Sequence, residues 1–170
     1  MTSSALAAFA ASSVFPIAMM WAGLTDLTSM TIRNGLVLFL LAAYLVLAPL
    51  AGFGAGEIGR SVVVALAILA GAFLMFARGW IGGGDAKLVA AASLWLGADQ
   101  VVAYLGTTAL LGGILALGLL LFRRLPLPAA LGTAWVAQLH RRDAGIPYGV
   151  ALGLAAIAAF PETSWARLLF

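Results

Sequence analysis

Long apolar runs make up most of this chain, and the few charged residues divide them from one another. A helix needs about 20 residues, with a range of about 17–25, to cross the hydrocarbon core of a bilayer. Four runs reach that length, and a fifth, residues 61–77, is just long enough. The four longer runs are residues 2–25, 34–56, 100–122 and 144–161. With a sixth, shorter run between them, the pattern predicts an all-α polytopic membrane protein of about six transmembrane helices.

The sixth run, residues 88–98, is too short to cross a membrane alone. Counted from Asp85 to Gly97 it has 13 residues, which span about 20 Å against a core of about 30 Å. Either this helix begins below the membrane surface, or the glycine segment before it also lies at membrane depth. Both arrangements place Asp85 in a recess.

Composition supports a membrane protein with one domain, residues 1–170. Hydrophobic residues make up 64% of the chain, charged residues 9%, and the mean hydropathy is +1.12. The chain has no cysteine and only one histidine, His140, so we expect no disulfide, no thiolate nucleophile, no metal site and no cofactor. The small basic excess, 9 Lys and Arg against 6 Asp and Glu, indicates topology and contact with anionic membrane lipids, and we expect no nucleic-acid partner. The first 25 residues lack the positive n-region of a signal peptide, so we interpret them as a retained span.

The basic residues predict the orientation. With six alternating spans, Arg60 and Arg167 fall on one side of the membrane. The other seven fall together on the opposite side: Arg33, Arg78, Lys87, Arg123, Arg124, Arg141 and Arg142. By the positive-inside rule the side with seven is cytoplasmic, so both termini are expected outside. Asp26 and Asp85 then share the cytoplasmic side.

The longest polar connection, residues 123–145, is predicted to contain a short helix. Pro126 and Pro128 should end the preceding span. Apolar residues then recur at helical spacing, namely Leu131, Trp135, Val136 and Leu139. We interpret this segment as an interfacial helix on anionic headgroups, with a substrate-docking surface as the alternative.

Asp26 and Asp85 are the candidate chemical groups, because a carboxylate at the end of an apolar run is costly and suggests function. Two neighbouring carboxylates do not both ionise cheaply, so one keeps a proton while the other acts as a base. Such a pair can activate water against a peptide carbonyl and stabilise the oxyanion that develops. The pair titrates as a unit, so the sequence does not assign the proton. The structural alternatives are a boundary marker for Asp26 and a helix N-cap for Asp85.

The glycines before Asp85 have a separate physical role. Gly82, Gly83 and Gly84 lack Cβ, can adopt positive φ and allow another backbone to come close. A substrate strand beside Asp85 would need that access; the alternative is a simple turn. Lys87 is interpreted as an interfacial anchor or as a charge that tunes the site.

Three motifs in order resemble those of type IV prepilin peptidases. Residues 82–88, Gly-Gly-Gly-Asp-Ala-Lys-Leu, followed by Trp-Leu-Gly at 95–97, resemble the Gly-x-Gly-Asp signature. Asp26-Leu27, with Ile-Arg-Asn at 32–34, resembles the first motif, although Arg33 stands where the family usually has proline. Ile-Pro-Tyr-Gly at 146–149 resembles the late motif that enters the last span.

This resemblance implies that Asp26 and Asp85 are the catalytic aspartates of a membrane aspartyl endopeptidase, without a metal or a cofactor. It implies supporting roles for other motif residues: Gly82, Gly83, Gly84, Lys87, Asn34 and Pro147. The implied substrates are prepilins and pseudopilins, whose leaders are cut at the cytoplasmic face of the bacterial inner membrane. The oligomeric state is left open.

The chain also departs from the larger members of that family. They carry a cytoplasmic insertion with Cys-x-x-Cys zinc ligands, and many N-methylate the new pilin terminus. This chain has no such insertion, so it resembles the minimal subclass that serves tight-adherence (Flp-type) pili. We therefore expect no zinc-binding insertion and no methyltransferase activity.

Two other classes of membrane protein compete with this interpretation. A small proton- or cation-coupled transporter would use Asp26 and Asp85 as ion sites and the glycines as a broken helix. It should show interrupted helices in repeated halves and polar residues near the midplane, and neither is found in the sequence. A structural membrane subunit explains the hydrophobicity but not two carboxylates in matching motifs.

Overall fold

The computed structural model describes residues 3–126 and 133–169, and these form helices without any strand. The long helices are α1 (Ser3–Ser29), α2 (Asn34–Leu50), α3 (Ala55–Ala77) and α4 (Gly83–Phe122). They are followed by α5 (Ala134–His140), α6 (Tyr148–Ala159), the 3₁₀ turn η2 (Phe160–Glu162) and α7 (Ser164–Arg167). The predicted all-α fold is confirmed for the described residues.

The helices are long and apolar enough for a multi-pass membrane protein. Helices α1, α3 and α4 and the stretch Tyr148–Arg167 each reach the length and hydropathy of a membrane span, and α2 is a shorter apolar helix. Many large apolar side chains of α2, α3 and α4 are exposed on the outside of the bundle, as lipid contact requires. Helices make up most of each of the six predicted segments, and α4 contains two of them. Run 34–56 is not one helix, however, since a turn that includes Gly52 (φ 90°) separates α2 from α3.

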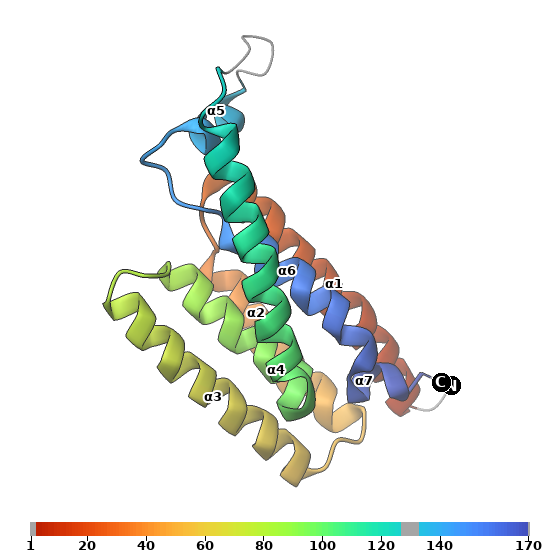
Figure 1. The fold of residues 1–170 in the computed structure, drawn as a ribbon. Coiled ribbons are helices and arrows are strands. Elements are labelled where there is room, and N and C mark those ends of the chain that lie inside the picture. The colour runs from red at the N-terminus through yellow and green to blue at the C-terminus, as the bar shows by residue number, and fades with distance from the viewer. Residues whose placement is uncertain (1–2, 127–132, 170) are drawn as a thin grey trace.

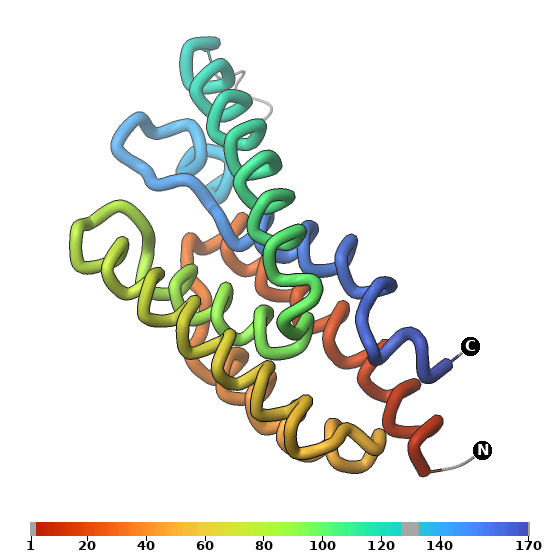
Figure 2. Tube along the Cα trace, turned by 60° about the horizontal axis from the view of Figure 1, so that its bottom comes forward, coloured from red at the N-terminus to blue at the C-terminus, as the bar shows by residue number. Residues whose placement is uncertain are grey.

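Helix α4 is divided at Gly97 into two arms. Gly97 has φ 73° and ψ 177°, a backbone conformation that glycine adopts more readily than any residue with a Cβ. The inner arm, residues 83–96, runs toward Gly97, and the outer arm, residues 98–122, turns back from it, as both views show (Figures 1 and 2). The two predicted segments on either side of this glycine are therefore separate helices in space.

The inner arm is the buried centre of the bundle. Every residue from Leu88 to Leu96 is buried, and the arm packs between α2, α3, α6 and the outer arm of α4. Its 14 residues extend about 21 Å, less than a bilayer core. Because neighbouring helices surround it, this short arm is shielded from lipid, and it carries Asp85 at its first turn.

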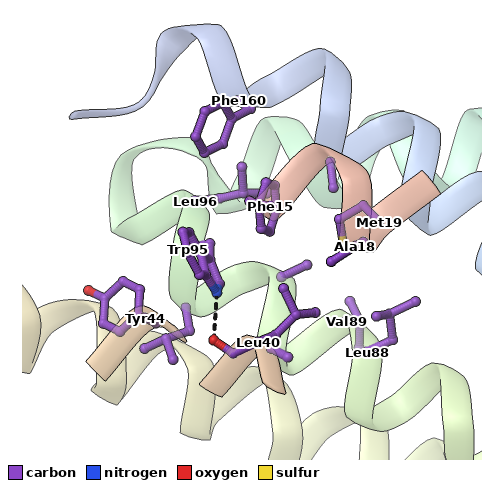
Figure 3. Packing of buried hydrophobic residues seen from close by; sticks show 14 of the residues in the cluster. Phe15, Ala18, Met19, Leu40, Tyr44, Leu88, Val89, Trp95, Leu96 and Phe160 are labelled. Atoms are coloured by element: carbon purple, nitrogen blue, oxygen red, sulfur yellow. Dashed lines mark hydrogen bonds between the residues drawn. The ribbon is translucent and has the colours of Figure 1, made fainter. Parts of the chain in front are cut away.

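An aromatic cluster anchors the far end of the inner arm (Figure 3). Trp95 donates a hydrogen bond from Nε1 to the carbonyl of Leu40 on α2, at 3.0 Å. Its ring stacks on Phe15 of α1 with centroids 5.2 Å apart, and Trp165 donates from Nε1 to the Trp95 carbonyl at 3.1 Å. Phe15 also stacks on Phe160. One side chain thus ties α1, α2 and the C-terminal segment to the arm that carries Asp85.

Helices α1 and α6 pack through glycine. A Cβ added at Gly153 would lie 2.7 Å from the carbonyl oxygen of Met19, and one added at Gly23 would lie 3.4 Å from Cα of Val150. Glycines spaced four apart on α6, Gly149 and Gly153, let the two backbones approach as in other closely packed membrane helices. This contact brings the start of α6 against the last turns of α1.

The connections alternate between the two ends of the bundle. The turn at 30–33, the turn at 78–82 and α5 lie toward one end, whereas the turn at 51–54, the bend within α4, the start of α1 and α7 lie toward the other (Figures 1 and 2). This agrees with the predicted alternation, and the assignment of one end to the cytoplasm stays a prediction. The predicted short helix is α5, with Leu139 buried. Pro128 and Leu131 lie outside the described residues.

Candidate active site

Asp26 is buried in the last turns of α1. Its side chain is 6% exposed, and its Oδ2 accepts a hydrogen bond of 2.7 Å from the backbone N–H of Gly149. Gly149 lies in the first turn of α6, where backbone N–H groups have no partner within the helix. The partial positive charge of a helix N-terminus favours a carboxylate at this place.

Asp85 lies at the third position of α4 and is half-buried. Its carboxylate accepts a hydrogen bond from the backbone of Gly82, the residue that precedes the helix. The alternative prediction, that Asp85 is the N-cap of this helix, is therefore wrong. Gly82 is the N-cap, and Asp85, three residues later, reaches back to it as in a capping box. Asp85 lines a cavity together with Tyr148, the neighbour of the Gly149 that donates to Asp26, so the structure brings the two predicted acids close to one another.

The two carboxylates are held in the same way. Each accepts a hydrogen bond from a glycine backbone at a helix N-terminus, Asp26 from Gly149 of α6 and Asp85 from Gly82 of α4. A Cβ added at either glycine would lie 2.9 Å from Oδ2 of its aspartate. At Gly149 the added atom would also lie 2.8 Å from Cβ of Asp26, so glycine is needed there for close approach, whereas at Gly82 only the end of the Asp85 side chain would have to move. Charge-assisted hydrogen bonds of this kind orient a carboxylate strongly.

The glycine segment, residues 82–84, allows close packing of neighbouring residues, and none of its glycines adopts positive φ. Gly82 has φ −71°, and none of the three glycines has positive φ. The expectation of positive φ at this segment is wrong, because α4 already begins at Gly83; the positive φ of this turn is at Gly79. Close approach is present, since a Cβ at Gly84 would lie 3.0 Å from Cβ of Ile32 and one at Gly83 would lie 3.2 Å from the ring of Phe76.

The first two motifs meet through Asn34 and Lys87. Lys87 donates from Nζ to Oδ1 of Asn34 at 3.0 Å, and both side chains are exposed. Lys87 therefore joins the start of α2 to the first turns of α4, close to Asp85 in sequence. Arg33, which replaces the usual proline, has φ −72° and ψ 136°, a conformation that proline also adopts. The departure at this position leaves the local backbone in the conformation that a proline would favour.

The third motif is positioned by its loop. Pro147 is buried and immediately precedes α6. Arg123, at the end of α4, donates from Nε to the carbonyl of Leu139 and from Nη2 to that of Gly145, both at 2.8 Å. These bonds hold the segment between α5 and α6 in place. They therefore help to position the backbone N–H of Gly149, which donates the hydrogen bond to Asp26.

A cavity of about 350 Å³ adjoins Asp85. Its wall comes from α3, both arms of α4 and α6 and is mostly apolar. Tyr148 forms part of it and packs so closely on α4 that a Cβ at Gly112 would lie 2.6 Å from its ring. The predicted recess at Asp85 corresponds to this cavity.

Comparison with known protein families now decides the relationship. Residues 13–117, more than half of the chain, match the type IV leader peptidase family. The chain belongs to that family. No curated protein and no solved structure gives a significant match. The predicted relationship to type IV prepilin peptidases is confirmed, and both Asp26 and Asp85 fall inside the matched region.

Membership of the type IV leader peptidase family implies an aspartic-type prepilin peptidase, with prepilins as its substrates. The geometry suits that chemistry, because two carboxylates with separate backbone donors lie at one end of a membrane bundle, and one of them, Asp85, adjoins an apolar cavity. Among the described residues, no three His, Cys, Asp or Glu side chains are placed to hold a metal ion.

Sequence reasoning did not single out three residues of this leader peptidase site. Gly149, which donates to Asp26, and Tyr148 belong to the Ile-Pro-Tyr-Gly motif but have no predicted role, and Thr108, which lines the cavity beside Asp85 with Tyr148, belongs to no predicted motif. The position of Gly149 just after a proline, at the start of a helix, is the signal that could have indicated a free N–H donor. Nothing in the sequence distinguishes Thr108 from Thr107.

Replacing Gly84 by valine is expected to reduce prepilin processing by about tenfold or more. The new side chain would press on Ile32, shifting α4 against the turn after α1 and so separating the carboxylates; overpacking of this kind costs about 1–3 kcal/mol. Gly118→Val on the outer arm is the matched control, because nothing lies within 4 Å of its Cβ position. The measurement is the ratio of precursor to mature pilin at equal enzyme levels. Equal losses in both variants would show general damage to the helix.

Proposed function

We propose that this protein is a membrane aspartyl endopeptidase that removes the leaders of Flp-type prepilins and pseudopilins, with Asp26 and Asp85 as its catalytic pair. The observation that carries the proposal is the convergence of these two acids, from motifs 59 positions apart in the sequence, at one site in a type IV leader peptidase. The whole chain, residues 1–170, would act as one peptidase domain. We place it in the bacterial inner membrane, with cleavage at the cytoplasmic face.

The proposed reaction uses both acids with one proton between them. The ionised carboxylate takes a proton from a water molecule, which attacks the scissile carbonyl carbon. The protonated carboxyl donates to the carbonyl oxygen as negative charge develops there. The tetrahedral intermediate then collapses as the amine of the new pilin terminus leaves with a proton. The bonds from Gly149 and Gly82 support this by fixing the orientation of each carboxylate.

The supporting motif residues have structural roles in this proposal. Lys87 and Asn34 fix the start of α2 against the first turns of α4. Gly83 and Gly84 allow close contact with α3 and with the turn after α1. Pro147 directs the chain into α6, so that the Gly149 N–H faces Asp26.

Co-expression with a Flp-type prepilin tests the proposal. We expect the precursor to lose its leader only when this protein is present, and mass spectrometry should show a new pilin terminus without an added methyl group. A methylated terminus would contradict the proposed absence of methyltransferase activity. An unprocessed precursor, with the protein correctly inserted, would instead favour the transporter class.

A further inference from the structure

A groove separates α2 from α3 on the outside of the bundle. Both helices pack on α4 and make few contacts with each other. The groove between them has a volume of about 480 Å³, and the small side chains of Ala90 and Ala91 on the inner arm of α4 form its floor. Its walls are apolar side chains of the two helices, namely Val37, Leu38, Leu41, Ala65, Leu66 and Leu69. Several of these wall residues are exposed, so the groove opens toward the surrounding lipid.

Two polar side chains lie at one end of this groove. Lys87 and Asn34 line it, and Lys87 donates from Nζ to Oδ1 of Asn34 at 3.0 Å. Asn34 is the first residue of α2 and follows the turn at 30–33, near one end of the bundle (Figure 1). Leu41, seven residues further along α2, lies about 10 Å deeper. The groove therefore has a polar entrance and an apolar interior.

The polar entrance carries positive charge that the protein does not neutralise. Within residues 3–126 and 133–169, no carboxylate forms an ion pair with Lys87 or with Arg33, the exposed residue next to Asn34. A lysine ammonium has three N–H donors, and the bond to Asn34 uses one of them. The side-chain amide of Asn34 adds N–H donors of its own. This entrance therefore suits an anionic group, such as the phosphate of a lipid at the membrane surface.

We propose that the groove binds an anionic phospholipid of the membrane, with its phosphate at Lys87 and Asn34 and one acyl chain along the apolar walls. This inference does not depend on the proposed function. A zwitterionic lipid such as phosphatidylethanolamine brings an ammonium of its own, which the cations at the entrance would repel.

The size of the groove favours an acyl chain over the helix of a pilin. A helix is about 10–12 Å across, so a piece of helix as long as the groove would occupy roughly 800 Å³ or more. The groove offers about 480 Å³. An acyl chain is narrower, and it has no backbone polar groups that would need partners at this depth. Such a chain would contact α2, α3 and the inner arm of α4 together, and so should stabilise their packing.

Lys87→Gln tests the contact with the headgroup. Native mass spectrometry of the full-length protein in detergent, with phosphatidylglycerol added, gives an apparent Kd for each successive lipid. We expect the tightest Kd to rise about tenfold, because a hydrogen bond to a charged group is lost, while glutamine keeps an N–H donor for Asn34. Wild-type protein should bind phosphatidylethanolamine about tenfold more weakly than phosphatidylglycerol.

Arg142→Gln is the matched control for the loss of charge. Arg142 is also an exposed cation without an ion pair among the described residues, but it does not line the groove. Its tightest Kd should stay within about twofold of the wild-type value.

Ala65→Leu tests the acyl chain separately from the charge. Ala65 lies in the wall of the groove on α3, and leucine there would fill part of the space. We expect the tightest Kd for phosphatidylglycerol to rise about tenfold, since about two methylene groups of the chain would lose their contacts. Ala70→Leu is the control, because Ala70 is exposed on the same helix and does not line the groove. Thermal unfolding without added lipid should give the same midpoint for both variants.

Four outcomes would overturn the inference. The first is wild-type affinity in both Lys87→Gln and Ala65→Leu. The second is equal affinity of the wild-type protein for phosphatidylglycerol and phosphatidylethanolamine. Equal losses in Lys87→Gln and Arg142→Gln would show general attraction to the basic surface. Normal lipid binding by Ala65→Leu, with a raised KM for a synthetic prepilin, would assign the groove to the substrate helix. The lipid measurements involve no cleavage, so failure of the proposed function would leave this inference standing.

Discussion

Asp26→Asn and Asp85→Asn are each expected to abolish prepilin processing, lowering the rate by at least about 10²–10⁴-fold, the contribution of a positioned acid or base. Asparagine keeps the shape of the side chain and an oxygen that can accept the N–H of Gly149 or Gly82. It does not supply the shared proton of the pair. The measurement is the appearance of mature pilin over time at matched enzyme levels.

Asp99→Asn is the control for the two aspartate variants. Asp99 lies just after Gly97, at the other end of the inner arm from Asp85, in a small cavity with Glu57 and Arg60. Removing its charge should leave processing unchanged. Processing at a near wild-type rate by either Asp26→Asn or Asp85→Asn would refute the assignment of the pair.

Gly149→Ala is expected to reduce kcat/KM by about 100-fold while the protein still inserts in the membrane. The added Cβ would lie 2.8 Å from Cβ and 2.9 Å from Oδ2 of Asp26, so α1 and α6 must move apart or the Asp26 carboxylate must rotate. Either change breaks the hydrogen bond of 2.7 Å from the Gly149 N–H, and a shift of about 1 Å at reacting groups can cost about 10²-fold in rate.

The control for Gly149→Ala is Gly145→Ala. Gly145 lies in the same connection, and nothing is within 4 Å of its Cβ position, so that variant should cleave at the wild-type rate. A fully active Gly149→Ala enzyme would show that the bond to Asp26 does not orient the acid for catalysis. Thermal unfolding in detergent, measured for both variants, separates a local effect from loss of the fold.

Much of the fold follows from hydropathy along the chain. The apolar runs predicted the helices. The short segment predicted to end at Gly97 corresponds to the inner arm of α4, which ends at the same glycine in the structure. These properties are local, because each helix satisfies its own backbone hydrogen bonds and a membrane imposes a minimum apolar length. The glycine segment shows the limit of such reasoning, since its composition suggested positive φ while its packing placed two of its glycines inside a helix.

The sequence by itself determined the class of molecule, the approximate helix segments, the two aspartates and, through three short motifs, the family. Tertiary structure alone decided which groups surround those aspartates. They are the N–H of Gly149, 123 positions from Asp26 in the sequence, the hydrogen bond between Lys87 and Asn34, and the cavity beside Asp85 that Thr108 also lines. These depend on how closely helices cross, which is set by the fit of whole surfaces at residues such as Gly153 and Trp95. A hydrophobic pattern specifies that a helix is apolar, but in a membrane nearly every helix face is apolar, so the pattern does not specify which faces meet.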